Sequence, residues 1–216
     1  MNPIPIIWCL GAILAVGGLV FYKMRFNKAA NGKKLLFLGP EESGKTTLYN
    51  WFTKNQPTTN YTASGDKNDY EDPTHQFVDE KHKIRYADMG GSDWFLNHGE
   101  FEKHYKENDI LIFVFDVKKY LNDNGMRDDV NARIDFMYTM EKHSREKKKC
   151  IVFVGSHIDQ LDLKKTEIEV KLRESVGNKE YSELLQNNGI LLADLTKKSS
   201  AIKVLKECII KMEKKS

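Results

Sequence analysis

The alternation of apolar and polar segments along the chain predicts strands that are separated by helices. Continuous apolar runs are typical of strands in a parallel sheet that is covered on both faces. Such runs lie at 33–38, 109–117, 150–155 and 189–195. The segments between them, at 46–54, 100–106, 130–147, 164–175 and 180–186, are predicted helices. A closing helix is predicted at 202–212, where Ile202, Leu205, Ile209 and Met212 form an apolar stripe at helical spacing. The order predicts an α/β fold with a mostly parallel sheet and right-handed crossover connections.

A predicted hairpin completes the sheet. Segments 75–79 and 83–88 are short strand candidates, and residues 80–82 are the candidate turn between them. The preceding residues 56–72 are rich in Asn, Thr, Gly, Asp and Ser, which is typical of a loop. Together with the four apolar runs, the two hairpin segments bring the predicted sheet to six strands.

The amino-terminal segment has the length and composition of a membrane span. No charged side chain occurs between Pro3 and Tyr22, and about 20 apolar residues cross the core of a bilayer. Trp8 and Tyr22 stand near its two ends, where aromatic rings favour the membrane interface. A cleaved signal peptide is the alternative, but it requires basic residues before the apolar stretch, and none precede it. We therefore predict a transmembrane anchor at 1–25 and a linker at 26–32.

Basic residues after this span predict its orientation. Lys23, Arg25 and Lys28 follow it, and positive residues stay on the cytosolic side of a membrane. The expected product is a single-pass membrane protein with one cytosolic domain at 33–216. Over the whole chain, 34 basic and 31 acidic residues give a net charge of +3, so composition offers no case for a direct nucleic-acid partner.

The strongest motif runs from Gly39 to Thr46 and reads GPEESGKT. It matches the pattern G-x-x-x-x-G-K-[ST], in which backbone N–H groups wrap a phosphate between a strand and a helix N-terminus. Lys45 is expected to reach the β- and γ-phosphates of a nucleotide, and the Thr46 hydroxyl is expected to ligate Mg²⁺. The candidate nucleotide-binding residues of this segment are Gly39, Glu41, Glu42, Ser43, Gly44, Lys45, Thr46 and Thr47.

A second candidate motif, of the form D-x-x-G, follows the predicted hairpin between Asp88 and Gly91. An aspartate in this place holds Mg²⁺ through water, and a glycine N–H senses the γ-phosphate. Alone, such a short pattern is weak. Its position after the phosphate motif and a hairpin makes Asp88 a candidate metal ligand and Gly91 a candidate nucleotide-binding and catalytic residue.

With these motifs in this order, residues 33–214 resemble the Ras-like small GTPases, and among them the Arf family and the β subunit of the signal recognition particle receptor. Pro73 and Thr74 before the hairpin, and the D-x-G-G sequence after it, carry the resemblance. It implies a three-layer P-loop GTPase fold that binds GTP or GDP with Mg²⁺. It also implies that Thr74 closes on Mg²⁺ and the γ-phosphate, and that Lys45 and Thr74 contribute to catalysis.

A membrane anchor in front of a GTPase domain is similar to the receptor β subunit. Arf proteins use a lipidated amphipathic helix instead, whose acylated glycine follows the initiator methionine. Asn2 excludes that modification here. If the resemblance to the receptor subunit is orthologous, it implies the endoplasmic reticulum as the membrane.

The base-reading motif departs from the family pattern N-K-x-D and reads SHID from Ser156 to Asp159. The resemblance implies that Asp159 accepts two hydrogen bonds from guanine, which discriminates against adenine. His157 is expected to stack on the base in place of the family's lysine. Ser156 replaces the asparagine that ties neighbouring loops together, so we expect weaker nucleotide affinity than is usual in the family. Thr196 follows the last predicted strand and resembles the family's third base-side loop.

Ser92 stands where Arf proteins have the glutamine that orients the attacking water. A serine is too short to hold that water in line with the γ-phosphate. We therefore expect intrinsic GTP hydrolysis to be slow or to depend on a residue of a partner. An alternative is that His98 takes the place of the glutamine, although a polar surface residue is its simpler interpretation. The resemblance also implies that a protein partner reads the switch regions at Thr74 and at Asp88–Phe95.

Three functions fit these observations. The first is a membrane-anchored GTP switch that recruits a partner at the cytosolic face. The second is a constitutively GTP-bound module that does not hydrolyse its nucleotide, which Ser92 favours. The third is a P-loop ATPase or kinase, and the aspartate at position 159 argues against it.

Overall fold

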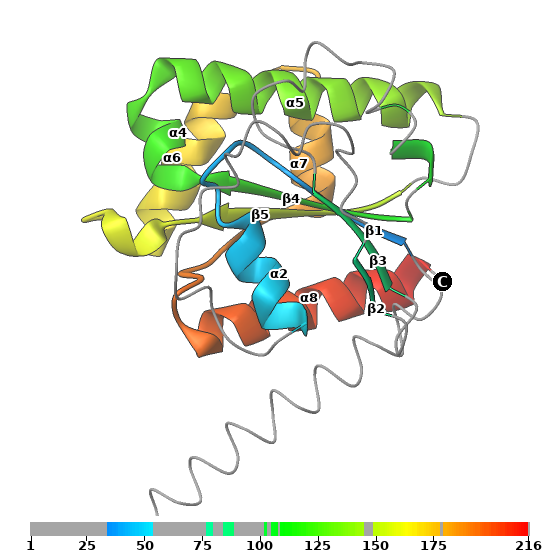
Figure 1. Cartoon of the computed structure of the whole chain (residues 1–216). Helices are drawn as coiled ribbons and strands as arrows, with labels where there is room; N and C mark the ends of the chain where they lie inside the picture. Colours follow the sequence, from blue (N-terminus) through cyan, green and yellow to red (C-terminus); the bar gives the residue numbers. More distant parts are fainter. Residues whose placement is uncertain are drawn as a thin grey trace, which may run out of the picture.

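Six strands of the computed structural model form one sheet in the order β2-β3-β1-β4-β5-β6 (Figure 1). The structure describes residues 34–53, 77–79, 84–88, 102, 105–107, 109–144, 149–177 and 179–215. Every neighbouring pair of strands is parallel except β2 and β3, which are antiparallel. The strands are β1 (Lys34–Leu38), β2 (Phe77–Asp79), β3 (Ile84–Asp88), β4 (Ile110–Asp116), β5 (Cys150–Ser156) and β6 (Ile190–Leu192).

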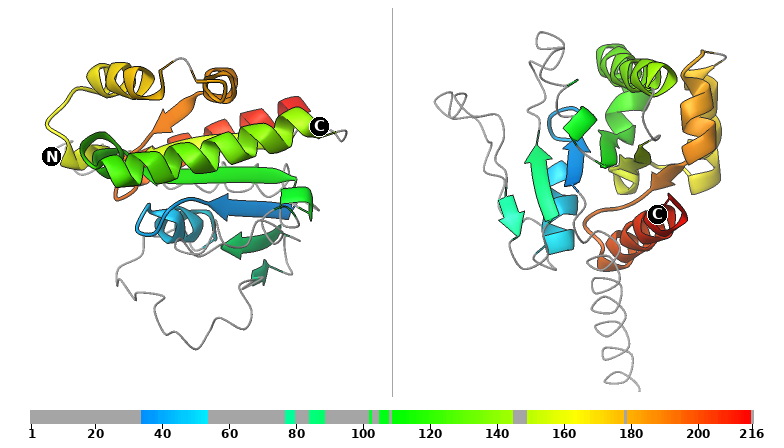
Figure 2. Two further views of the ribbon diagram at one scale, coloured as in Figure 1. Left: turned by 90° about the horizontal axis from the view of Figure 1, so that it is seen from above. Right: turned by 90° about the vertical axis from the view of Figure 1, so that its right-hand side faces the viewer.

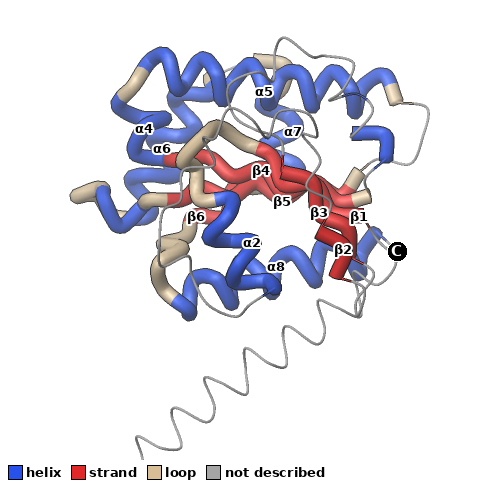
Figure 3. The backbone as a smooth tube through the Cα atoms, in the orientation of Figure 1, coloured by secondary structure: helices blue, strands red, loops and turns tan. Residues whose placement is uncertain are grey.

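Helices cover both faces of the sheet, so that the described residues form three layers (Figures 1 and 3). Helices α2 and α8 lie on one face, and α4, α5, α6 and α7 lie on the other, as the two further views also show (Figure 2). The helices are α2 (Lys45–Thr53), α4 (Val117–Asn122), α5 (Asn124–His143), the 3₁₀ turn η1 (Ile158–Gln160), α6 (Lys165–Val176), α7 (Ser182–Asn188) and α8 (Lys198–Lys215).

The core sits on the two faces of the central strands β4 and β5, all of whose residues are buried. Successive side chains of a strand point to opposite faces, so each strand supplies both cores. Leu111, Phe113 and Phe115 pack with the layer of α4 to α7. Ile112 and Val114 pack with α2 and α8. This two-sided burial explains why these strands appear in the sequence as continuous apolar runs.

The α/β fold and its mostly parallel sheet are as the sequence predicted, but the helix predicted at 130–147 has the wrong bounds. The chain forms α4 directly after β4 and then α5, which begins at Asn124 and ends at His143. Two aspartates produce this break. The Asp116 side chain accepts a hydrogen bond from the Lys119 N–H, and that of Asp123 from the Met126 N–H. Each therefore caps a separate helix.

The last strand is also shorter than the predicted 189–195, because β6 ends at Leu192. The Asp194 carboxylate accepts hydrogen bonds from the N–H and the hydroxyl of Thr196. A side chain that bonds the backbone two residues further on closes a turn, which competes with an extended strand.

No helix within the described residues is long and apolar enough to cross a bilayer. The predicted anchor at 1–25 and the predicted linker at 26–32 lie outside the described residues. Both therefore stay predictions from the sequence.

Candidate functional site

The carboxyl ends of the parallel strands bring most of the predicted site residues to one edge of the sheet. Gly39 follows β1, Asp88 ends β3, and Asp116 ends β4. Ser156 ends β5, and Thr196 follows β6. In open α/β sheets, ligands bind outside this edge, because loops and helix N-termini from several strands converge there.

The first residue of the phosphate loop, which comprises residues 39–46, lies in close contact with β4. Gly39 has φ +137°, and a Cβ atom at this position would lie 1.8 Å from the carbonyl oxygen of Val114. Gly44 has φ +92° and lies against the side chains of Leu195 and Ser156. Both positions favour glycine, because L-residues with a side chain rarely adopt such φ values. The loop therefore leads from β1 into the N-terminus of α2 with its backbone tightly wound.

Lys45 folds back over this loop. Its ammonium group donates to the carbonyl oxygens of Gly39 at 2.8 Å and of Pro40 at 2.5 Å, and the residue is only 7% exposed. The hydroxyl of Ser43 is buried, and it has no hydrogen-bond partner among the described residues. Leaving a buried hydroxyl unpaired costs about 1–3 kcal/mol. A cation and an unpaired hydroxyl on one backbone nest fit a bound phosphate.

The other predicted residues of the phosphate loop lie at its surface. Glu41, Glu42 and Thr46 are exposed, and Thr47 is half-buried. Glu42 has φ +57°, and its carboxylate forms an exposed ion pair with Lys119. A role of Glu41 or Glu42 in nucleotide binding would therefore be played by the backbone N–H groups rather than by the carboxylates.

The base loop, residues 156–159, is tied to the phosphate loop by Ser156. Its hydroxyl lies 2.7 Å from the carbonyl oxygen of Ser43 and 3.0 Å from that of Phe115. It thus joins β5 to the phosphate loop and to β4. Our expectation that a serine would lose the tie made by the family's asparagine is wrong. The Ser156 Oγ atom reaches both carbonyl groups because the loops approach closely at Gly44.

His157 and Asp159 follow within the same loop. His157 has φ +56° and ψ +27°, a left-handed conformation that is uncommon for residues other than glycine and asparagine. Its Nδ1 atom lies 2.8 Å from the Ser156 Oγ atom and 3.5 Å from the Asp116 Oδ2 atom. Asp159 is exposed in the turn η1, so its carboxylate is free to meet a ligand from solvent.

The third loop, residues 194–197, closes the site from β6. Burial alone would raise the pKa of Asp194, but hydrogen bonds from Thr196 and Lys197 outweigh it and lower the pKa below its usual value. The pKa of Lys197 is raised, mainly by Asp194 and further by the charge of Asp159. Thr196 is exposed beside them. The Asp159 carboxylate is thus close enough to act on the Lys197 ammonium group, so the base loop and the third loop are neighbours.

Helix α2 also holds the third loop in place. The Trp51 Nε1–H group donates to the carbonyl oxygen of Leu195 at 2.8 Å, and both residues are buried. Nothing in the local sequence around Trp51 indicated this contact, since the two residues are 144 positions apart. The same helix that begins at Lys45 therefore positions Thr196.

Three predicted residues, Thr74, Gly91 and Ser92, lie outside the described residues. Of the predicted partner-binding region, only Asp88 is described, as the last residue of β3. Its backbone lies opposite Phe37 of β1, two positions before Gly39. The register therefore brings Asp88 to the same sheet edge as the phosphate loop.

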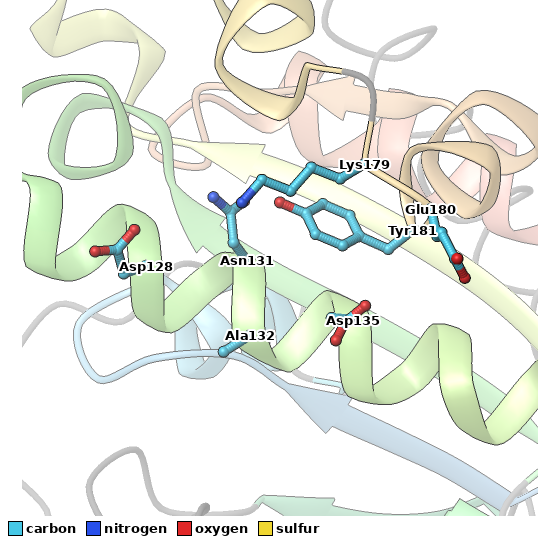
Figure 4. Close-up of a pocket in the computed structure, with 7 residues that line it drawn as sticks. All are labelled: Asp128, Asn131, Ala132, Asp135, Lys179, Glu180 and Tyr181. Carbon is cyan, nitrogen blue, oxygen red and sulfur yellow. The ribbon is translucent and has the colours of Figure 1, made fainter.

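A separate hollow of about 440 Å³ lies between α5 and the start of α7 (Figure 4). Tyr181 lines it, and its buried hydroxyl has no hydrogen-bond partner among the described residues. Burial and the charges of Asp135 and Asp128 raise the pKa of Tyr181, so its phenol stays neutral. None of the lining residues belongs to the phosphate, base or third loop, so the hollow is no part of the candidate site.

Two comparisons with known proteins bear on this arrangement. The family model described as "Ras of Complex, Roc, domain of DAPkinase" matches residues 34–159, from β1 to the base loop. Among solved structures, an ADP-ribosylation-factor-like GTP-binding protein, a small COPII coat GTPase from Encephalitozoon cuniculi in complex with GDP, is similar with a TM-score of 0.58. The identity is 15%, over 97% of this chain and 93% of that one, so the likeness shows a shared fold. No curated protein matches this sequence.

Proposed function

The chain belongs to the Roc (Ras of Complex) family of Ras-like GTPase domains, and from this premise we propose that it is a guanine-nucleotide-dependent switch anchored in a membrane. One observation carries the proposal. The phosphate loop with Lys45 and the base loop with Asp159 lie at the same edge of one sheet and are joined by the Ser156 hydroxyl. A nucleotide that spans the two loops would meet phosphate donors at one end and a base acceptor at the other.

The choice of base is assigned to Asp159. Its exposed carboxylate would accept hydrogen bonds from the two N–H groups on one edge of guanine, whereas adenine offers no such pair there. The solved relative is a complex with GDP, which agrees with a guanine nucleotide as the ligand. A site built to hydrogen-bond two N–H groups discriminates strongly against a base that lacks them, because its acceptor then stays unpaired.

Mg²⁺ is the metal that this site would hold. The Thr46 hydroxyl stands in the first turn of α2, and Asp88 ends the strand next to β1. Hydroxyl and carboxylate oxygens are the ligands that Mg²⁺ prefers, usually together with phosphate oxygens. We assign Thr46 and, from the sequence, Thr74 as direct ligands and Asp88 as a ligand through water. The bound ion would supply charge neutralisation at the β- and γ-phosphates.

The membrane part of the proposal rests on residues 1–25. An uncharged segment from Pro3 to Tyr22 is long enough to span a bilayer, and the basic residues that follow would keep the GTPase domain in the cytosol. On this proposal, nucleotide state at the switch regions, including Thr74 and Asp88, controls which partner is recruited to the membrane surface. The endoplasmic reticulum remains the specific membrane implied by the resemblance to the receptor β subunit.

A comparison of GDP and ADP affinities tests the proposal with the purified full chain in detergent. We expect GDP to bind more tightly than ADP by about 100-fold or more, the size of discrimination that paired polar groups provide. The variant Asp159→Ala should lose most of this preference and bind both nucleotides weakly. Asp162→Ala is the control, because it removes an aspartate just outside the base loop and should leave the preference intact. Tighter binding of ADP would overturn the proposal.

A second candidate function is a GTP-bound module without turnover, and Ser92 favours it. The side chain that orients the attacking water contributes to hydrolysis in Ras-like proteins, and a serine is too short for that task. Single-turnover hydrolysis of GTP by the full chain separates the candidates. A slow rate that increases in Ser92→Gln supports the switch with a weakened catalytic apparatus. GTP that stays intact for hours in both proteins, with cell extract added, supports the static module.

A further inference from the structure

The hollow between α5 and the start of α7 contains a buried hydroxyl group without a partner. Tyr181 is only 4% exposed, and no described residue forms a hydrogen bond with its hydroxyl group. Most buried polar groups in native proteins have a partner, because an unpaired one is unfavourable. Figure 4 shows the hydroxyl group directed toward Asn131, whose side-chain oxygen accepts from the Tyr120 hydroxyl group instead. The Tyr181 hydroxyl group is therefore available to a ligand of the hollow.

Two carboxylates of α5 give the hollow negative charge. Asp128, Asn131 and Asp135 are three and four positions apart, so they lie on one face of the helix. Burial raises the pKa of Tyr181, and the charges of Asp135 and then Asp128 raise it further, so both carboxylates act on its hydroxyl group. Within the part of the chain that the structure describes, no lysine or arginine forms an ion pair with either carboxylate. The hollow therefore favours a cation.

The other charged residues of the hollow leave this preference in place. Glu180 pairs with Lys142, which is not one of the lining residues, at 3.1 Å. Lys179 is the one cation of the lining, and it is exposed. Figure 4 shows its side chain directed toward Asn131, the residue between the two aspartates. Since the contacts of an exposed lysine contribute little free energy, another cation can displace its ammonium group.

The spacing of the carboxylates indicates an organic cation rather than a metal ion. Asp128 and Asp135 are seven positions apart, which is about 10 Å along an α-helix, whereas Ca²⁺ and Mg²⁺ hold their ligands within about 2.6 Å. No group of the described residues could hold a metal. A volume of about 440 Å³ accommodates an organic group. A guanidinium group has N–H donors in a fixed plane and no acceptor, which suits a hydroxyl oxygen beside a carboxylate.

From this geometry we propose that the hollow binds the guanidinium group of an arginine side chain from a protein partner. The group displaces the Lys179 ammonium group, donates to the Tyr181 hydroxyl oxygen and pairs with Asp135, the carboxylate that acts more strongly on that hydroxyl group. It does not reach Asp128 as well, so backbone N–H groups beside the arginine donate to this second, exposed carboxylate. Arginine and tyrosine are common among the residues that dominate protein interfaces. None of the lining residues belongs to the three loops of the nucleotide site, so the interaction goes beyond the proposed function.

The test uses the full chain in detergent with isotope-labelled alanine methyl groups. Ala132 lines the hollow, whereas Ala193 and Ala201 belong to the core on the other face of the sheet and serve as references. The probe is a peptide of arginine between two glycines with blocked termini, and its control has citrulline, which is similar in shape but uncharged. The NMR signal of Ala132 should shift, with a dissociation constant about tenfold lower for the arginine peptide. Equal constants, or no shift of Ala132, would overturn the proposal.

Variants separate ligand binding from structural support. Asp135→Asn should weaken binding of the arginine peptide about threefold or more, because it removes one charge-assisted contact. Lys179→Gln removes the competing cation and should strengthen binding. Tyr181→Phe should weaken binding but leave the melting temperature unchanged or raise it, because the hydroxyl group has no partner among the described residues. A Tyr181→Phe variant that melts at a lower temperature and binds the peptide normally would contradict the role of the hydroxyl group. GDP affinity should stay normal in all three variants.

A small guanidinium compound distinguishes a protein partner from a free cation. Propylguanidine carries the group of the arginine side chain without a peptide backbone. We expect it to bind more weakly than the arginine peptide and to be insensitive to Asp128→Asn, whereas the peptide should lose affinity in this variant. Propylguanidine that binds as tightly as the peptide would overturn the assignment of the hollow to a protein partner.

Discussion

Replacement of Lys45 by alanine is expected to lower the affinity for GDP by about 100-fold or more. In the structure its ammonium group lies on the carbonyl oxygens of Gly39 and Pro40, nearly buried within the phosphate loop. A bound phosphate would exchange these neutral acceptors for anionic oxygens. A hydrogen bond with a charged group contributes about 1.5–3 kcal/mol, and the loss of two such bonds from one cation accounts for the expected change.

Lys142→Ala is the matched control, because Lys142 of α5 has the same side chain and forms an exposed ion pair with Glu180. Exposed pairs contribute about 0–1 kcal/mol to stability, and Lys142 lies outside the phosphate, base and third loops. Titration calorimetry with GDP should show normal affinity for this variant. Equal affinity of Lys45→Ala and the wild type would mean that Lys45 only stabilises the loop.

The phosphate loop was predictable because all its parts are adjacent in the sequence. A strand, two glycines at a fixed spacing, a lysine and a helix start occur within residues 34–53, and the structure reproduces this order. The continuous apolar runs likewise identified β4 and β5, since burial on both faces leaves no polar positions. Local patterns of this kind can be interpreted without knowledge of contacts between distant parts of the chain.

The base loop shows where sequence reasoning failed. Ser156 appeared to be a weakened version of the family's asparagine, but its hydroxyl reaches carbonyl groups 113 and 41 positions away in the sequence. Whether a short side chain can bridge two loops depends on how closely they approach. That distance is set by packing around Gly44 and Leu195 and leaves no trace in the local sequence. The contact between Trp51 and the third loop was missed for the same reason.

The predicted helix boundaries were wrong for a different reason, which lies in the residues at the helix ends. The sequence predicted α5 from Val130 onward but gave no signal for α4 or for the residues of α5 before Val130. The sequence analysis did not identify Asp116 and Asp123 as helix caps, although both act as caps in the structure. An aspartate at the end of an apolar strand fits a binding role as well as a cap. In the structure Asp116 caps α4 and also contacts His157, so the two interpretations were never exclusive.

Gly39→Ala is expected to cost about 2–4 kcal/mol of unfolding free energy and to abolish GDP binding at micromolar concentrations. The new Cβ atom would lie 1.8 Å from the carbonyl oxygen of Val114, and the backbone has φ +137°. Movement of Val114 would cost free energy, because β4 is paired with β1 on one side and with β5 on the other. The phosphate loop must therefore shift, which displaces the carbonyl groups on which Lys45 rests.

Gly189→Ala separates backbone strain from this collision. Gly189 also has a positive φ, +68°, but a Cβ atom there would meet nothing within 4 Å. Its cost should be about 1 kcal/mol, the usual penalty for alanine in such a conformation, and GDP affinity should stay normal. Urea unfolding of the full chain in detergent gives the stabilities, and titration calorimetry gives the affinities. If both variants lose the same stability and both bind GDP, then the contact between the phosphate loop and β4 does not shape the nucleotide site.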